Sequence, residues 1–294
     1  MQENIPPIEL PADLDGYLRI SEARFADIRP GAEKTIVWAD HENPARTPWS
    51  IVYLHGFSAS RQEVAPLVDI VAGKLGANVF FTRFTGHGRE PDAMGSISAE
   101  ALLRDALEAQ EIGKRLGDRV IVMGSSTGAT LATWLASRDH SHAISALVML
   151  SPNFGLHRAV SEFLLYPGGK ILLHLIEGPR YHFEPHNAQH QKYWTTQYPS
   201  KALIPLMQVV KLARDKDLRR IQHPTLMLYS PRDTVINAKL VPKYFARLGS
   251  PHKALHIISD LSDPQNHTLA GDILAPDSTQ AVAEKILEFV SHIA

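Results

Sequence analysis

The composition of the 294-residue chain excludes several classes of protein. Hydrophobic residues at 44% and charged residues at 21% are typical of a folded globular protein, not of a disordered or fibrous one. The 30 Lys and Arg residues almost balance the 31 Asp and Glu residues, and no run of like charges is long enough to follow a phosphate backbone, so we expect no nucleic-acid partner. Cysteine is absent, which excludes disulfides, thiolate metal sites and a cysteine nucleophile.

The N-terminal sequence Met1–Pro7 has neither the basic region nor the apolar region of an export signal. No uncharged apolar run of 18 residues occurs in the chain, so we expect no integral membrane segment. Cytoplasmic localisation is therefore the default expectation. An exported or anchored form that had lost its N-terminal signal would carry the same sequence.

The first half of the chain alternates between predicted strands and predicted helices, after a short N-terminal helix expected over residues 12–25. Strands are predicted at residues 34–39, 50–54, 77–82, 120–123 and 146–150, and helices at residues 62–75, 100–116 and 129–137. Because consecutive strand–helix units place strands side by side in the same direction, this order predicts an α/β fold with a mainly parallel central sheet and helices on both faces.

Residues 153–222 interrupt this alternation. They contain recurring prolines and many aromatic and histidine residues but no convincing strand, and their best helix is expected at residues 206–220. Strands resume at residues 224–229 and 253–258, and an amphipathic helix at residues 279–293 closes the chain. We therefore expect one core domain, formed by residues 1–152 and 223–294, with residues 153–222 inserted as a helical cap.

The sequence Gly124-Ser125-Ser126-Thr127-Gly128 lies between a strand buried on both faces and a helix. The two glycines permit a strand-to-helix turn tight enough to expose the side chain of its central residue. Ser126 is therefore the candidate nucleophile, and Ser125 is expected to point elsewhere. Such a short motif recurs by chance, so its meaning depends on partner residues elsewhere in the chain.

Those partners are expected just after the predicted strands, because ligands bind at the carboxyl ends of the strands of an open α/β sheet. Asp233 directly follows the strand at 224–229, and His267 lies in a loop after the last predicted strand. A serine hydroxyl needs a base to take its proton, and an imidazole serves best when a carboxylate fixes its tautomer. Ser126, Asp233 and His267 supply all three groups.

Other residues compete for two of these roles. Asp260 and Asp263 are alternatives to Asp233, although both lie just before His267, where capping or solvating the loop is the simpler function. His55 and His87 also follow strands, but each lies in a glycine turn, where we expect it to brace the loop by hydrogen bonds. The remaining alternatives to His267 are His252, His256 and His292.

The sequence resembles those of the α/β-hydrolase superfamily, and is most similar to its serine-aminopeptidase-like and monoacylglycerol-lipase-like branch. The residues that carry the resemblance are His55-Gly56-Phe57, Gly86-His87-Gly88, Gly124-Ser125-Ser126-Thr127-Gly128, Asp233 and Asn266-His267. It covers the chain from about residue 33 to the end and is weakest in the insertion, which is a variable cap in this family.

The resemblance implies that the backbone N–H groups of Phe57 and Thr127 form an oxyanion hole. Two donors from these turns could also converge physically on the carbonyl oxygen that becomes negative. Thr127 departs from the family pattern, because a β-branched residue at this position could narrow the acyl pocket. By resemblance we expect a small-molecule carboxylic ester with an apolar acyl chain, and neither a metal nor an organic cofactor.

Two features of the insertion leave alternatives open. His182, His186 and His190 have the spacing of metal ligands on a helix, but Pro185 interrupts it and a polar cap surface is the simpler interpretation. Several apolar residues of the insertion either line a substrate pocket or pack the cap onto the body: Phe154, Phe163, Leu164, Leu165, Tyr166, Leu172 and Leu173.

Two alternative functions also remain open. The same triad would serve a peptidase or amidase that cuts small substrates. A different class is a non-catalytic ligand-binding homologue that kept the fold. The serine at the centre of the turn argues against an aspartate-nucleophile dehalogenase or epoxide hydrolase.

Overall fold

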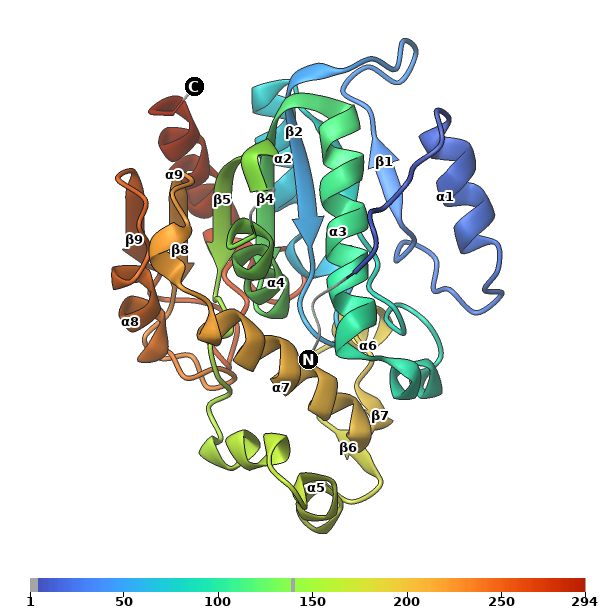
Figure 1. The fold of residues 1–294 in the computed structure, drawn as a ribbon, viewed down its shortest axis with the longest axis vertical. Coiled ribbons are helices and arrows are strands. Elements are labelled where there is room, and N and C mark those ends of the chain that lie inside the picture. The colour runs from blue at the N-terminus through green and yellow to red at the C-terminus, as the bar shows by residue number, and fades with distance from the viewer. Residues whose placement is uncertain (1–4, 139–140, 294) are drawn as a thin grey trace.

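A seven-stranded sheet forms the centre of the protein in a computed structural model that describes residues 5–138 and 141–293 (Figure 1). The segment Met1–Asn4, part of the sequence inspected for an export signal, lies outside the described residues. The strand order is β1-β3-β2-β4-β5-β8-β9. The strands are β1 (Thr35–Val37), β2 (Thr47–Leu54), β3 (Asn78–Phe81), β4 (Gly117–Ser125), β5 (Ile144–Leu150), β8 (Thr225–Tyr229) and β9 (Lys253–Ile257).

All neighbouring strands of this sheet are parallel except β1, which pairs with β3 in the antiparallel direction. The mainly parallel sheet expected from the sequence is therefore confirmed. The central strand β4 is buried from Val120 to Ser125 because helices cover both faces of the sheet, which explains its continuous apolar sequence. The carboxyl ends of β2, β4, β5, β8 and β9 lie at one edge of the sheet.

Helices cover both faces of the sheet, as expected. One face packs against α1 (Leu14–Glu22), α3 (Ala99–Leu116), α4 (Thr127–Ala136), α7 (Leu203–Asp215) and α8 (Leu240–Ala246). The other face packs against α2 (Leu67–Leu75) and α9 (Thr279–Ser291). The longest of them, α3, begins where the Ser98 side chain accepts a hydrogen bond from the Ala101 N–H, and basic residues in its last turn complement the helix dipole.

The helix expected at residues 62–75 is two elements. Residues Arg61–Val64 form a 3-10 turn, and the α-helix begins only at Leu67. Pro66 separates them because proline has no N–H to donate within a helix. The helix α8 had no counterpart in the sequence-based assignment, since its seven residues contain a proline and are too few to show a clear period.

Residues 153–222, which we call the cap segment, connect the neighbouring strands β5 and β8. They contain the 3-10 helix η4 (Ala159–Leu165), the helices α5 (Gly169–Glu177), α6 (Ala188–Tyr193) and α7, and the strands β6 (Arg180–His182) and β7 (Gln197–Pro199). In Figure 1, α5, β6 and β7 lie beyond the edge toward which the strand β2 points.

The expectation that the cap segment contains no strand is wrong. β6 and β7 form a separate antiparallel pair, with Tyr181 opposite Tyr198. Strands of three residues are too short to show an alternating pattern, and Pro199 within β7 lowers the strand signal further. The helix expected at 206–220 runs instead over α7 and packs against α3 and α4.

In the described part of the chain, no helix combines the length and the hydrophobicity that crossing a bilayer requires.

Candidate active site

Ser126 occupies a strained turn between β4 and α4. Its φ angle is +51°, in the left-handed region that a residue with a side chain rarely adopts. The flanking glycines are required by packing: a Cβ added at Gly128 would lie 1.8 Å from the Leu54 carbonyl oxygen, and one added at Gly124 would lie 2.5 Å from the carbonyl carbon of Gly128. The two glycines therefore let the backbone of the turn pack closely against β2, and the side chain of Ser126 projects from the turn.

Ser125 has a different environment, as expected. Its hydroxyl lies beside the buried side chains of Tyr53 and Glu63. Hydrogen bonding from this hydroxyl partly offsets the rise in the pKa of both groups that burial causes. Ser126, in contrast, lines the cavity at the edge of the sheet. Of the two adjacent serines, Ser126 lines the cavity, whereas Ser125 contacts buried polar side chains.

His267 and Asp233 are joined directly. The distance from His267 Nδ1 to Asp233 Oδ2 is 2.6 Å. Because a carboxylate only accepts hydrogen bonds, Nδ1 donates the proton, and Nε2 is free to act as a base. The other carboxylate oxygen of Asp233 accepts hydrogen bonds from the N–H groups of Val235 at 2.8 Å and Ile236 at 3.0 Å, which fixes its orientation. Burial by itself would lower the pKa of His267, but the carboxylates of Asp233, Asp263 and Glu63, with Asp233 the largest contributor among them, together raise that pKa.

The two competing carboxylates have other partners. Asp263 is buried and accepts hydrogen bonds from the backbone N–H groups of Gln265, His267 and Thr268 at 2.7–3.0 Å, so it shapes the loop that carries the histidine. The Asp260 side chain is exposed and lies 3.5 Å from Arg232. Of the three candidates, the structure places Asp233 on the imidazole.

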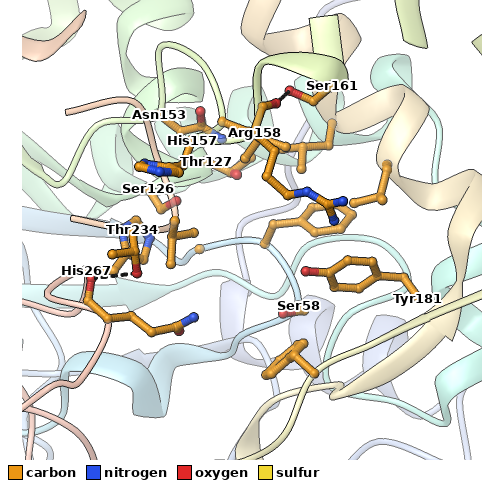
Figure 2. A pocket seen from close by; sticks show the side chains of 18 of the residues that line it. Ser58, Ser126, Thr127, Asn153, His157, Arg158, Ser161, Tyr181, Thr234 and His267 are labelled. Atoms are coloured by element: carbon orange, nitrogen blue, oxygen red, sulfur yellow. Dashed lines mark hydrogen bonds between the residues drawn. The ribbon is translucent and has the colours of Figure 1, made fainter. Parts of the chain in front are cut away.

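Ser126 and His267 face the same cavity, and Figure 2 shows them on one side of it, across from Arg158 and Tyr181. No hydrogen bond joins the Ser126 hydroxyl to His267 in the described part of the structure. Catalytic hydrogen bonds are often long in ligand-free enzymes and tighten when substrate binds.

The Phe57 and Thr127 N–H groups are available as donors at this cavity. Both residues line it, and neither N–H donates to an acceptor within the described residues. Thr127 is the first residue of α4, where an N–H has no partner inside the helix. The Phe57 ring is held edge-on between His87, at 5.2 Å between ring centres, and Tyr198, at 5.8 Å.

His55 and His87 brace the turns in which they lie. His55 Nδ1 donates to the Gly56 carbonyl at 2.8 Å, and its Nε2 accepts from the Phe84 N–H at 3.1 Å, so the ring is neutral and both nitrogens are occupied. His87 Nδ1 donates to the Thr85 carbonyl at 3.1 Å. Burial lowers the pKa of both rings, that of His87 to about 4.

The three histidines of the cap segment are spread over different elements. His182 belongs to β6, His190 to α6, and His186 to the connection between them. His190 is buried and its Nδ1 accepts from the His186 N–H at 3.1 Å. Within residues 5–138 and 141–293, no group of three or more His, Cys, Asp or Glu side chains could hold a metal ion.

The cavity beside Ser126 measures about 250 Å³ and has a mostly apolar wall. Among the apolar residues for which pocket lining and cap packing were both open, Leu164 and Leu173 line the cavity. Phe154 stacks on Tyr244, while Phe163 and Tyr166 are exposed. Further apolar lining residues are Leu156, Val160, Ile176, Phe183, Trp194, Leu203, Leu206 and Leu274. A polar part of the wall is formed by the ion pair of Arg158 and Glu177, 2.6 Å apart.

Sequence reasoning missed Glu63, which also lines the cavity and is buried. Its Oε1 accepts hydrogen bonds from the Gly56 N–H at 2.6 Å and from the Tyr53 hydroxyl at 2.7 Å. Burial raises the pKa of Glu63 to about 7. In the sequence Arg61-Gln62-Glu63 it looks like a surface charge. The available signal was Tyr53, because the hydroxyl of a tyrosine in a strand buried on both faces needs a hydrogen-bond partner.

Comparison with known proteins agrees with this architecture. The family described as "Serine aminopeptidase, S33" matches residues 45–263, which is most of the chain. YnbC, an uncharacterized protein of Escherichia coli (strain K12), is 26% identical over 226 residues, covering 71% of this chain and 36% of that protein. The chain therefore spans about a third of the length of this curated relative.

Solved structures share the fold at low sequence identity. One of the metagenome-derived lipolytic enzymes LipS and LipT has a TM-score of 0.73 at 19% identity, over 90% of this chain and all of that chain. A monoacylglycerol lipase of Paleococcus ferrophilus has a TM-score of 0.66 at 16% identity, over 89% of this chain and all of that chain. A soluble variant of the Saccharomyces cerevisiae monoglyceride lipase has a TM-score of 0.65 at 15% identity, over 89% and 91%.

The extent of the family match, together with the sheet order and the serine turn between β4 and α4, fixes the classification. The chain belongs to the serine aminopeptidase S33 family of α/β-hydrolases.

Proposed function

We propose that this protein is a serine hydrolase that cleaves uncharged carboxylic esters through an acyl-enzyme. The observation that carries the proposal is the 2.6 Å hydrogen bond between Asp233 and His267 at the same cavity as Ser126. Imidazole, carboxylate and a serine in a strained turn are the parts that nucleophilic catalysis by serine requires.

In this mechanism the Ser126 hydroxyl attacks the ester carbonyl carbon while His267 Nε2 takes its proton. Asp233 holds Nδ1 and stabilises the imidazolium that forms. The N–H groups of Phe57 and Thr127 donate to the oxyanion of the tetrahedral intermediate. His267 then protonates the leaving alcohol, and water, deprotonated by the same imidazole, releases the acid and regenerates Ser126.

The cavity wall supports an apolar acyl chain as the part of the substrate bound beside Ser126. Leu164, Leu173 and Trp194 come from the cap segment and are largely buried, so an acyl chain there would be removed from water. We propose that residues 153–222 form the cap over this site and that residues 1–152 and 223–294 form the core. Monoacylglycerol lipases and esterases among the structural neighbours are consistent with this substrate class.

A panel of p-nitrophenyl esters of graded chain length, run beside aminoacyl amides, tests the proposal. We expect turnover of the esters and labelling of Ser126 by a fluorophosphonate probe. The family description supports aminopeptidase activity as a second candidate, which faster turnover of the amides would favour. An unlabelled Ser126 in folded protein would indicate a non-catalytic binding protein.

A further inference from the structure

Glu63 places a buried carboxyl directly behind the turn that carries Phe57. Oε1 accepts from both the Gly56 N–H and the Tyr53 hydroxyl, and Tyr53 is fully buried in β2. A Cβ added at Gly56 would lie 2.8 Å from Glu63 Oε2 and 3.5 Å from the Ser126 Cβ. Carboxyl, turn and nucleophile are therefore packed together without space between them.

Gly56 needs such a constraint because glycine has access to more backbone conformations than any other residue. Its two neighbouring peptide groups determine where the Phe57 N–H points. His55 Nδ1 holds the peptide after Gly56 through its carbonyl oxygen at 2.8 Å. Glu63 holds the peptide before Gly56 through its N–H at 2.6 Å. The turn is thus fixed from both sides.

We propose that Glu63 is a positioning residue for ester hydrolysis: anchored by Tyr53, its carboxyl fixes the Gly56 peptide so that the Phe57 N–H points at the developing oxyanion. The inference rests on the proposed function of Ser126 and adds a residue outside the triad. Glu63 acts through the backbone and takes no part in the proton transfer.

This role needs a hydrogen-bond acceptor rather than a negative charge. An ionised and a protonated carboxyl both leave Oε1 able to accept two hydrogen bonds. Around neutral pH both forms are populated, because burial raises the pKa of Glu63 to about 7. The groups that face it are the Tyr53 hydroxyl, the Ser125 hydroxyl and the His267 ring. A glutamine, which keeps the amide oxygen, should therefore replace Glu63 in this role.

The test compares Glu63→Gln, Glu63→Leu and Tyr53→Phe in the full chain with p-nitrophenyl butyrate. We expect Glu63→Leu to lower kcat by about 100-fold while changing KM by less than about threefold, because an oxyanion donor acts mainly in the transition state. Glu63→Gln should keep kcat within about threefold of the wild type, and Tyr53→Phe should fall between the two. Inhibition by a trifluoromethyl ketone, which forms a tetrahedral adduct, should weaken in parallel with kcat/KM.

A matched control is Glu108→Leu. Glu108 is also buried and also accepts from a tyrosine hydroxyl, that of Tyr17, but it lies on α3 and does not line the cavity. We expect this variant to lower the melting temperature without changing kcat. A loss of kcat equal to that of Glu63→Leu would show a general effect of removing a buried carboxyl and would overturn the proposal.

Hydrogen exchange gives a readout that does not depend on activity. The amide hydrogens of the peptide that contains Gly56 and Phe57 should exchange faster in Glu63→Leu than in the wild type. In Glu63→Gln their exchange rate should equal that of the wild type. Unchanged exchange in Glu63→Leu, or a kcat for Glu63→Gln as low as that for Glu63→Leu, would overturn the role. Wild-type protein that neither turns over an ester nor reacts with the fluorophosphonate would instead overturn the proposed function, and this inference with it.

Discussion

The edge of the sheet and the cap segment differ in the contacts that organise them. At the edge, buried carboxylates hold backbone N–H groups: Asp263 holds the loop of His267, and Asp233 holds the turn that follows it on the chain. In the cap segment, apolar side chains line the cavity on the inside while others are exposed, with Ile171 at 69% and Leu175 at 76% on the helix α5. In the proposed function, polar contacts at the edge therefore position the reacting groups, and apolar contacts in the cap segment select the substrate.

The comparison predicts that substitutions at the edge change kcat and substitutions in the cap change substrate preference. Ser126→Ala should have the largest effect, a loss of about 10⁶-fold in kcat on a p-nitrophenyl ester, with the melting temperature nearly unchanged. Ser137→Ala, at the end of α4, is the matched control and should keep full activity. Turnover that survived in Ser126→Ala and vanished in Ser125→Ala would move the nucleophile by one residue.

Asp233→Asn should reduce kcat by about 10⁴-fold, because an amide cannot hold the imidazole in the required tautomer. Asp263→Asn should cost less, since that side chain bonds to the backbone and only raises the pKa of His267 from a distance. Steady-state kinetics of the two variants with one ester decides between them. A larger loss for Asp263→Asn would show that Asp263, and not Asp233, is the carboxylate of the triad.

The pH dependence of kcat/KM should show an acid limb above the ordinary histidine value of about 6.5. The base must be neutral, and Asp233, with smaller contributions from Asp263 and Glu63, raises the pKa of His267 despite its burial, so activity is lost as pH falls through that raised value. Below the limb the rate should fall about tenfold per pH unit. A profile with its acid limb below the ordinary histidine value would contradict the electrostatic role of Asp233.

In the cap segment, Leu173→Trp should fill part of the cavity and lower kcat/KM for long-chain esters by about 10-fold or more, while short-chain esters change little. Ile171→Trp is the control on the same helix, because Ile171 is exposed and does not line the cavity. Equal effects on both chain lengths would mean that the acyl chain binds elsewhere.

The smallest expected effect is on stability. The pKa of Glu63 is raised on folding, so its contribution to stability is fully present below the ordinary glutamate pKa and is lost as pH rises to about 7. Glu63→Gln does not ionise and avoids this loss. Its melting temperature relative to the wild type should therefore increase between pH 5 and pH 9, as thermal unfolding at a series of pH values would show.

The parts of this site that sequence could predict are those encoded by local pattern. Gly124 and Gly128 predict the turn at Ser126, because their spacing reflects how closely the backbone must pass β2. Asp233 follows a strong strand, which places it at the correct edge of the sheet. The roles of the triad and of the oxyanion donors stay predictions until the variants are measured.

The parts that sequence could not predict depend on contacts between distant elements. Tyr198 meets Phe57 only because β7 folds back onto the edge of the sheet, and β7 is too short to show a strand pattern. The hydrogen-bond partners of Glu63 are Tyr53 in β2 and Gly56 in the turn after β2, and its own segment does not reveal them. A residue whose partner is set by tertiary packing leaves no periodic signal in its own segment.

The placement of α7 predicts that the rest of the cap segment can be exchanged. β5 and β8 are neighbours with Leu150 opposite Leu228, and a parallel crossover needs only a dozen or so residues, which α7 supplies by itself. We therefore expect that the residues between β5 and α7 can be lengthened, shortened or replaced without shifting the register of the sheet. A replacement segment would still need an aromatic ring in place of Tyr198, which contacts Phe57, and a donor in place of the Thr195 N–H, which donates to the Ser58 carbonyl at 2.7 Å.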